Sequence, residues 1–381
     1  MLRATAFLAL ASLAVAAGCT DQPALTAPPT HANAIVSIDP PPEPVTASVD
    51  GPVALEGFPG STYNVAAAIN DGGVVVGPSS LGGVEHAVRW PAGSTAPIDV
   101  GMGRPSDINN AGQIAGEFGI HAALWTPNGA GGYALTLLDA QLPSPNYSQA
   151  QAINANGQVV GSYQVQSNGE WVRKCFLWTP DKPNATTGTL TTLPDLGGTF
   201  CAAADINSRG YVVGASTTSK GDQHGFVWSP PSWGLPGRIR DLTPNGDPSY
   251  ASSINDGGQI AGQHVTQTTA SAAIWTPSGG QYVLTDIGTF TGLQTWATAI
   301  NDAGFVVGWA SGSNSAEFDA FFWQNGEFTL LPGTTSITNP TALTGLNGNS
   351  VQVVGLSQDA ATGVVTALRW NVTLTQGPPT R

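Results

Sequence analysis

Three kinds of reactive side chain recur along the chain at matching places in a repeated phrase. Carboxylates close a short apolar run at Glu56, Asp99, Asp139, Asp195, Asp241 and Asp286. Histidines open another apolar run, which ends in tryptophan, at His86, His121 and His224. Carboxylates and imidazoles bind zinc and transfer protons in general acid–base catalysis. The first hypotheses are therefore a metal site or a centre for acid–base catalysis.

The repetition itself favours a role in the fold. A group needed for one reaction has no reason to recur in most repeats, and copies one repeat apart are too far from one another to bind a single ion unless they face a shared channel. The chain has no lipase-type Gly-x-Ser-x-Gly, no phosphate-binding loop and no His-Glu-x-x-His. We therefore expect no catalytic residue, no metal and no cofactor from these columns.

The repeated phrase is represented by residues 254–262, an asparagine turn followed by two small or β-branched residues and a glycine. Its asparagine stands at Asn70, Asn109, Asn154, Asn207, Asn255, Asn301 and Asn347. A tryptophan ends a later apolar run in each copy, at Trp90, Trp125, Trp178, Trp228, Trp275, Trp323 and Trp370. Repeats of this length, built from short β-branched and aromatic runs between Asn, Asp and Gly turns, are typical of four-stranded propeller blades.

One copy predicts four strands, at residues 252–255, 259–262, 272–275 and 282–287. Asparagine and glycine explain the tight turn between the first two strands, because both accept left-handed backbone. The chain is thus expected to be all-β, a seven-bladed β-propeller over residues 51–376 with a tail at 377–381. The last copy lacks a fourth strand, and residues 53–57 resemble one, so an N-terminal strand is expected to close the ring. Residues 372–374 are the alternative.

Antiparallel strands place the starts of the first and third strands of every blade at one rim, which we call rim A. An aromatic column lies there, just ahead of the first strands, at Tyr63, Tyr147, Phe200, Tyr250 and Trp296. Three tryptophans outside the repeated column, Trp171, Trp296 and Trp309, lie on the same rim, as do the longest loops. The aromatic side chains either cover the core beneath each loop, which we favour, or form a stacking surface for sugar rings.

Cys175 and Cys201 also lie at strand starts on rim A, in consecutive repeats. In an exported protein, such a pair can be oxidised to a disulfide, because the compartment outside the cytosol is oxidising. The alternative is two separate thiols, if the two strands lie too far apart.

The repeats resemble the bacterial extracellular HAF-repeat proteins. The resemblance is carried by the stretches 86–90, 121–125, 224–228 and 319–323, by Asp195-Leu196-Gly197-Gly198 and by the Ile-Asn-x-x-Gly turns. It covers residues 52 to about 374 and implies an exported, propeller-like protein without an established activity. Lys174, Ser271 and Thr366 stand in the histidine column, so the fold does not demand histidine there.

The N-terminus predicts export. Residues 1–18 form an alanine-rich apolar signal, too short to span a membrane, and Cys19 follows it as in a lipoprotein signal. Ordinary cleavage near residues 14–16 is the alternative. Residues 19–50 are rich in proline and read as a tether. We expect a lipoprotein of the bacterial outer membrane or cell surface, or a periplasmic or secreted protein if Cys19 is not lipidated.

Charge limits the partners. The chain carries 12 basic and 25 acidic residues, a net charge of -13, which repels nucleic acid. The function we favour is a monomeric binding or interaction module for a polysaccharide or a surface protein, attached to a membrane only through its lipid. The alternatives are a lyase or hydrolase that acts on glycans and a structural surface protein without a small ligand.

Overall fold

The computed structural model describes residues 45–142, 145–232, 234–289, 294–311, 318–333 and 337–376. These residues are built from β-strands and contain no α-helix, so the fold is all-β. No helix in this part of the chain is long and apolar enough to cross a membrane. Signal residues 1–18, Cys19, most of the tether and the tail lie outside the described residues.

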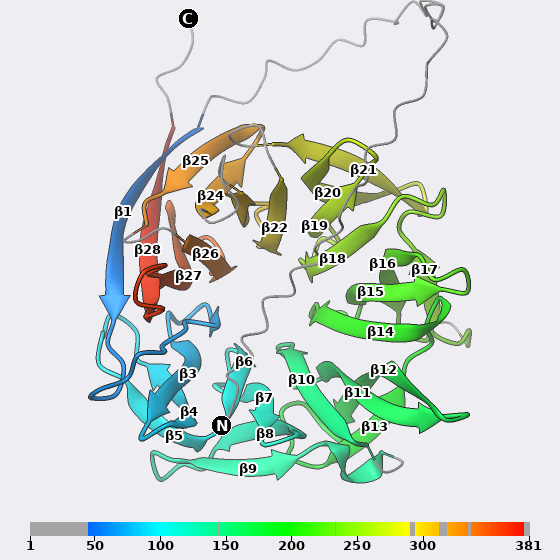
Figure 1. The fold of residues 1–381 in the computed structure, drawn as a ribbon, viewed down its shortest axis with the longest axis horizontal. Helices are drawn as coiled ribbons and strands as arrows, with labels where there is room; N and C mark the ends of the chain where they lie inside the picture. The colour runs from blue at the N-terminus through cyan, green and yellow to red at the C-terminus, as the bar shows by residue number, and fades with distance from the viewer. Residues whose placement is uncertain are drawn as a thin grey trace, which may run out of the picture. The chain divides into compact units, whose positions relative to one another are not determined.

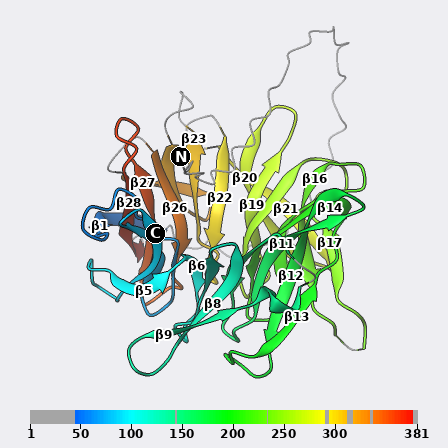
Figure 2. The ribbon, with the colours of Figure 1, turned by 60° about the horizontal axis from the view of Figure 1, so that its bottom comes forward.

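The strands form five sheets within the described ranges, three of four strands and two of eight. Each larger sheet contains two antiparallel groups of four, joined by one parallel contact, Arg173 to Phe200 in one and Phe318 to Ile337 in the other. We call the resulting groups units 1 to 7 (Figure 1). Figure 2 shows the neighbouring strands β19, β20 and β21 of unit 5 from a second direction.

Units 1 to 4 follow one another along the chain. Unit 1 comprises β2 (Ala68–Ile69), β3 (Val75–Leu81), β4 (Val84–Trp90) and β5 (Ile98–Met102). Unit 2 comprises β6 (Arg104–Ile108), β7 (Ile114–Phe118), β8 (His121–Pro127) and β9 (Tyr133–Leu137), followed by the short 3-10 helix η1 (Asp139–Gln141). Unit 3 comprises β10 (Tyr147–Ile153), β11 (Val159–Ser167), β12 (Glu170–Pro180) and β13 (Gly188–Thr192). Unit 4 comprises β14 (Gly197–Ile206), β15 (Val212–Thr218), β16 (Gln223–Ser229) and β17 (Arg238–Asp241).

Units 5 to 7 complete the array. Unit 5 comprises β18 (Ser249–Ile254), β19 (Ile260–Val265), β20 (Ala270–Ser278) and β21 (Gln281–Gly288). Unit 6 comprises β22 (Thr295–Ile300), β23 (Val306–Ser311), β24 (Phe318–Gln324) and β25 (Glu327–Leu331). Unit 7 comprises β26 (Ile337–Leu343), β27 (Ser350–Gln358), β28 (Val365–Gln376) and the N-terminal strand β1 (Val45–Leu55).

Strand β1 is antiparallel to β28, and Val53, Ala54 and Leu55 lie opposite Arg369, Leu368 and Ala367. The strand begins at Val45, inside the stretch expected to be tether, and not near residue 51. Residues 372–374, the alternative fourth strand, instead continue β28 beside β1. The strands of the representative copy are also longer than expected toward rim A.

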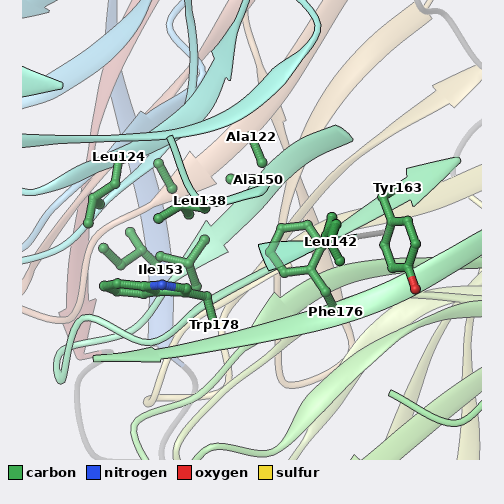
Figure 3. Packing of buried hydrophobic residues seen from close by; sticks show 11 residues of the cluster. Ala122, Leu124, Leu138, Leu142, Ala150, Ile153, Tyr163, Phe176 and Trp178 are labelled. Carbon is green, nitrogen blue, oxygen red and sulfur yellow. The ribbon is translucent and has the colours of Figure 1, made fainter. Parts of the chain in front are cut away.

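Apolar clusters lie between consecutive units. In the cluster of Figure 3, Leu124 and Ala122 of unit 2 pack with Ile153, Phe176 and Trp178 of unit 3. Similar clusters join the other neighbours, and one of them combines Val354 of unit 7 with Trp90 of unit 1. The repeated tryptophans are part of these clusters, as packing between sheets requires. The first strand of each unit contacts the first strands of the units on either side, including β26 with β2.

The turn asparagines form a second link between units. The side-chain amide of each donates to the backbone carbonyl of the equivalent turn residue in the next unit, at 2.9 to 3.2 Å. We call this chain of bonds the asparagine belt; it comprises Asn70, Asn109, Asn154, Asn207, Asn255 and Asn301, with the carbonyl of Thr344 as its last acceptor. Each side-chain oxygen also accepts the backbone N–H four residues later in its own turn.

The structure corrects the seventh copy. Asn347 is exposed, and its backbone pairs with Ser350. Thr344 occupies the place of the turn asparagine, because its hydroxyl accepts from the N–H of Gln352 at 3.1 Å. The turn of unit 7 is four residues longer than the others. The asparagine of the sequence motif, Asn347, therefore lies three residues after the residue that is structurally equivalent to the other turn asparagines. Threonine has no amide donor, so the belt ends there. A second bond, which several other turns also make to the next unit, is kept: the N–H of Gly345 donates to Asp71 of unit 1.

The repeated glycine is explained by a bulge in the first strand. The pairing of β18 with β19 shifts register between Ala251 and Ser253, and a Cβ added to Gly262 would overlap the carbonyl oxygen of Tyr250. A side chain there would prevent this close approach. The glycine therefore fixes the backbone of the residue that stands five positions before the turn asparagine.

Candidate functional site

The histidine and carboxylate columns bond to one another. Nδ1 of His121 lies 2.8 Å from Asp139, and the same distance separates His224 from Asp241; His86 lies 3.1 Å from Asp99. Asp99 and Asp241 also accept the backbone N–H two residues later, at 2.8 Å. The bonds tie the start of a third strand to the end of a fourth strand within one unit.

Two units without histidine, units 3 and 5, make the same bond with another donor. Lys174 donates to Asp195 at 2.6 Å, and the hydroxyl of Ser271 donates to Asp286 at 2.8 Å. Lysine and serine thus replace histidine as the donor to the carboxylate, which indicates that this bond has a structural role. Among the described residues, no group of three or more His, Cys, Asp or Glu side chains is arranged to hold a metal ion.

The aromatic column divides into two positions on the first strands or just ahead of them. Tyr63, Tyr147 and Phe200 stand seven residues before the turn asparagine, whereas Tyr250 and Trp296 stand five residues before it. Because these offsets differ, the aromatic column is not a single repeated position. Residues two apart on a strand point to the same face, but the members of the two groups have different neighbours.

The residue five positions before the turn residue, and the residue opposite it on the second strand, differ in chemistry from unit to unit. We call these two residues the inner pair of a unit. From unit 2 to unit 7 the inner pairs are Arg104–Glu117, Gln149–Ser162, Ala202–Ala215, Tyr250–Gln263, Trp296–Trp309 and Asn339–Leu356. The charged pair belongs to β6 and β7, and Figure 1 shows β6 across the centre of the array from β22.

Two inner pairs combine into an aromatic cluster. The rings of Trp296 and Trp309 are stacked with centroids 6.1 Å apart, and Tyr250 of unit 5 lies 4.9 Å from Trp296. Phe318 meets Trp309 edge to face at 5.1 Å. Nε1 of Trp296 donates to Ser252 at 2.8 Å, which fixes the indole. All four rings are partly exposed, so the aromatic cluster presents an apolar surface at rim A.

Tyr63 and Tyr147 instead belong to a polar network around the charged inner pair. Nε of Arg104 lies 3.2 Å from Glu85, and its Nη2 donates to the hydroxyl of Tyr63 at 3.3 Å. The hydroxyl of Tyr147 donates to Glu117 at 2.6 Å. Burial raises the pKa of Glu117, against the lowering effects of this bond and of Arg104. Burial and the neighbouring Glu117 raise the pKa of Tyr147, which therefore stays protonated.

Phe200 lies beneath a cation. The guanidinium of Arg173 is 5.5 Å from the centre of its ring, and Nε of Arg173 donates to Ser162 at 2.8 Å. Burial lowers the pKa of Arg173. Trp171 is 53% exposed and lies opposite Gln166 near the turn between β11 and β12, in a different unit from the aromatic cluster.

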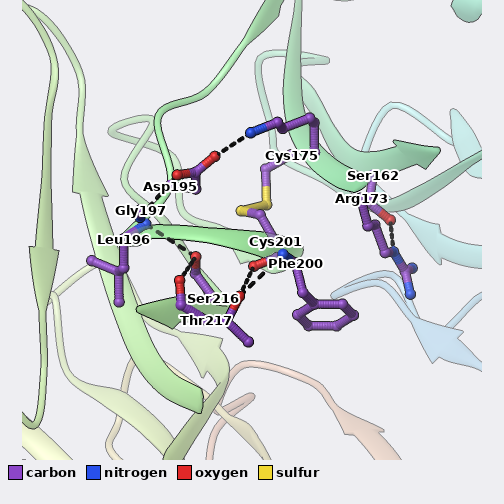
Figure 4. The surroundings of a disulfide bond; sticks show 11 residues. Ser162, Arg173, Cys175, Asp195, Leu196, Gly197, Phe200, Cys201, Ser216 and Thr217 are labelled. Atoms are coloured by element: carbon purple, nitrogen blue, oxygen red, sulfur yellow. Dashed lines mark hydrogen bonds and ion pairs between the residues drawn. A yellow bond between two sulfur atoms is a disulfide. The ribbon is translucent and has the colours of Figure 1, made fainter. Parts of the chain in front are cut away.

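A disulfide joins Cys175 of unit 3 to Cys201 of unit 4, with the Cα atoms 5.3 Å apart (Figure 4). Both residues are fully buried. The third strand of unit 3 runs parallel to the start of the first strand of unit 4 at this point, which brings the two cysteines together. The disulfide adds a covalent link between these neighbouring units.

Sequence reasoning missed the charged inner pair. Arg104 and Glu117 lie outside the aromatic and histidine columns, and neither is part of the repeated phrase. The sequence did contain one signal for this pair: Arg104 and Trp296 each stand five residues before the turn asparagine of their own unit. The cross-strand partners could not be assigned without the register of the bulged strand.

Two further carboxylates, both half-buried, accept backbone hydrogen bonds at the first-strand bulges. Asp107 accepts the N–H of Ile153 in the next unit and that of Ile108, both at 2.8 Å. Asp205 makes the equivalent bonds to Ile254 and Ile206. Burial raises the pKa of Asp107 to about 7, and burial also raises the pKa of Asp205.

The Asp107 carboxyl predicts a pH dependence of stability. Its pKa is higher in the folded chain than the ordinary value of about 3.9, so the folded state holds the proton more tightly. The stability it provides is present below about pH 4 and is lost as the pH rises through 7, with a slope of at most about 1.4 kcal/mol per pH unit. We expect the Asp107→Asn variant to lose this slope in urea unfolding measured from pH 4.5 to 7.5. The exposed Asp181→Asn change should leave the slope as in the wild type, and an unchanged slope in Asp107→Asn would contradict the assignment.

Comparisons with known proteins give a family match over part of the chain and structural likenesses over most of it. A family model described as a protein of unknown function (DUF3466) matches residues 106–228, and no protein with a curated function matches. A protein of unknown function from Dyadobacter fermentans is 10% identical, with a TM-score of 0.46 over 86% of this chain and 99% of that chain. TolB from Acinetobacter baumannii is 12% identical, with a TM-score of 0.39 over 80% of each chain. The WD40 domain of Toxoplasma gondii coronin is 12% identical, with a TM-score of 0.36 over 90% of this chain and 89% of that domain.

The family match runs from β6 of unit 2 to β16 of unit 4 and names no activity. The resemblance to HAF-repeat proteins stays an expectation from the sequence. What the described residues show by themselves is an all-β chain of repeated four-stranded units, and within residues 106–228 this chain resembles the DUF3466 proteins.

Proposed function

We propose that the chain is a seven-bladed β-propeller closed by β1 and that it binds carbohydrate at rim A. The pairing of β1 with β28 and the packing of unit 7 against unit 1 support the closure. With the ring closed, the first strands, which contact one another from unit to unit, surround the axis of the ring, and the inner pairs lie where these strands meet the second strands. The repeated residues hold the scaffold, which leaves the inner pairs free to differ.

The aromatic cluster is the single observation that carries this function. The rings of Tyr250, Trp296 and Trp309 are partly exposed and contact one another, and Ser252 holds the indole of Trp296 in place. Ring faces bind the apolar C–H faces of sugars, and an indole held by a hydrogen bond loses little freedom on binding. Covering the core, the other role expected for these aromatic residues, does not require three rings from two units to meet.

Export and lipidation at Cys19 complete the proposal. The signal at residues 1–18 and the proline-rich segment after it would leave the propeller tethered to a membrane surface and facing its ligand in solution. Metabolic labelling with a palmitate analogue tests this part separately, because a Cys19→Ser variant should lose the label.

Affinity electrophoresis in gels containing dextran, xylan, pectin or laminarin tests carbohydrate binding. We expect at least one polysaccharide to retard the protein, and the Trp296→Ala variant to bind it at least 10-fold more weakly. The matched control is Trp171→Ala, which removes an exposed tryptophan from the same rim outside the aromatic cluster and should bind as the wild type does. Absence of retardation in every gel, or equal losses in the two variants, would rule out this function.

A further inference from the structure

A cleft of about 340 Å³ opens at rim A between units 1 and 2. Its polar lining comes from Glu85, Arg104 and Glu117, and its apolar lining includes Val84, Met102 and Phe118. This volume lies at the lower end of the range of small-molecule sites. The cleft is formed by other residues than the aromatic cluster, so it is a separate place for a ligand.

The charges in the cleft do not cancel. Arg104 is paired with Glu85 at 3.2 Å, and its Nη2 is occupied by the hydroxyl of Tyr63. Glu117 accepts from the neutral hydroxyl of Tyr147, and no basic side chain of the described residues lies within ion-pair distance of it. One carboxylate therefore faces the cleft without a directly paired cation. A buried or half-buried charge of this kind gains most from a ligand that brings the opposite charge.

The walls of the cleft are apolar and accessible. Val84 is 48% exposed and Met102 is 52% exposed, although both are hydrophobic. Methionine adapts its shape to varied partners, which suits a binding surface. An exposed apolar wall beside a carboxylate that has no paired cation matches a ligand with a cationic head and a short hydrocarbon body.

We propose that this cleft binds a small organic cation, with a primary ammonium group at Glu117 and an apolar body against Val84 and Met102. An anion is disfavoured because Glu85 and Glu117 both face it and because the chain has a net charge of -13. A neutral polyol could satisfy the hydrogen bonds but would leave the charge of Glu117 unpaired, so it is the competing outcome of the test.

The proposal can be tested by NMR titration of the ¹⁵N-labelled protein with n-butylammonium chloride, n-butanol and sodium butyrate. We expect saturable shifts of the backbone signals of Gly103 and Gly119, which line the cleft, with the ammonium compound alone. The affinity should fall as the salt concentration rises, because the contact is ionic. Equal binding of n-butanol would overturn the assignment to a cation, and no saturable shift with any of the three would overturn the site.

Variants separate the charge from the shape of the cleft. Glu117→Gln keeps the volume and an acceptor for Tyr147, and we expect it to weaken n-butylammonium binding at least 10-fold. Glu170→Gln is the matched control, since Glu170 is an exposed carboxylate at the start of β12. Trp296→Ala should leave ammonium binding unchanged, so failure of the carbohydrate proposal and failure of this one are distinguishable. Unchanged binding in Glu117→Gln would contradict the role of Glu117.

Discussion

Replacing Asn255 with alanine is expected to lower the free energy of unfolding by about 3 kcal/mol. Asn255 is 4% exposed, and its amide donates to the carbonyl of Asn301 at 2.9 Å while its oxygen accepts the N–H of Gln259 at 2.8 Å. The alanine variant loses these two bonds and a third, from the amide of Asn255 to Oε1 of Gln259 at 3.0 Å, and leaves the N–H of Gln259 without its acceptor. Each unpaired buried group costs about 1 to 3 kcal/mol. Urea unfolding followed by tryptophan fluorescence measures the difference.

Two variants of unit 7 serve as controls for the asparagine belt. Asn347→Ala removes the asparagine that the sequence pattern assigned to the seventh copy, and because this residue is exposed we expect a change within about 0.5 kcal/mol. Thr344→Asn supplies the missing amide donor next to the carbonyl of Asn70, which accepts only from the backbone of Gly73 among the described residues. A gain of about 1 kcal/mol is expected. Equal losses in Asn255→Ala and Asn347→Ala would show that the belt does not stabilise the fold.

Reducing the disulfide between Cys175 and Cys201 is expected to lower the free energy of unfolding by about 3.5 kcal/mol. The two cysteines are 26 residues apart, and closing a loop of that length removes this much free energy of chain entropy from the unfolded state in the loop-closure treatment. The measurement compares urea unfolding of the full chain with and without dithiothreitol.

A variant with both cysteines replaced by alanine is the control for the disulfide. Dithiothreitol should have no effect on it, which also shows that Cys19 contributes nothing to the difference. A wild-type chain whose unfolding midpoint does not respond to dithiothreitol, although mass spectrometry shows both thiols alkylated, would refute the stabilising role.

The positions of the strands and turns within each repeat were predictable from the sequence, because they depend on local backbone preferences. An asparagine turn, two β-branched residues and a glycine specify a hairpin through backbone preferences within ten residues. The same reasoning failed at Asn347. The longer turn of unit 7 contains the asparagine motif, but Thr344 occupies the structural position of the turn asparagine. The same reasoning also ended the tether too late, since nothing local in residues 45–50 announces that they pair with β28.

The candidate site was predictable only in part. Trp296 and Trp309 were recognised because they break the repeat, and the structure brings them together with Tyr250. Trp171, chosen on the same grounds, lies in another unit. Tyr63 and Tyr147 were read as members of an aromatic column, whereas the structure assigns their hydroxyls to Arg104 and Glu117.

The sequence by itself determined the all-β class, the repeated four-stranded unit and the scaffold role of the asparagine, glycine and tryptophan columns, because these depend on turn chemistry and strand periodicity. The pairing of each histidine with its aspartate, the asparagine belt and the inner pairs were decided only by tertiary structure. Those contacts join residues from 13 to 53 positions apart, and their partners depend on the register at each first-strand bulge and on the contact between neighbouring units. A one-residue change of register would exchange the two faces of the strand, and no local pattern records that choice.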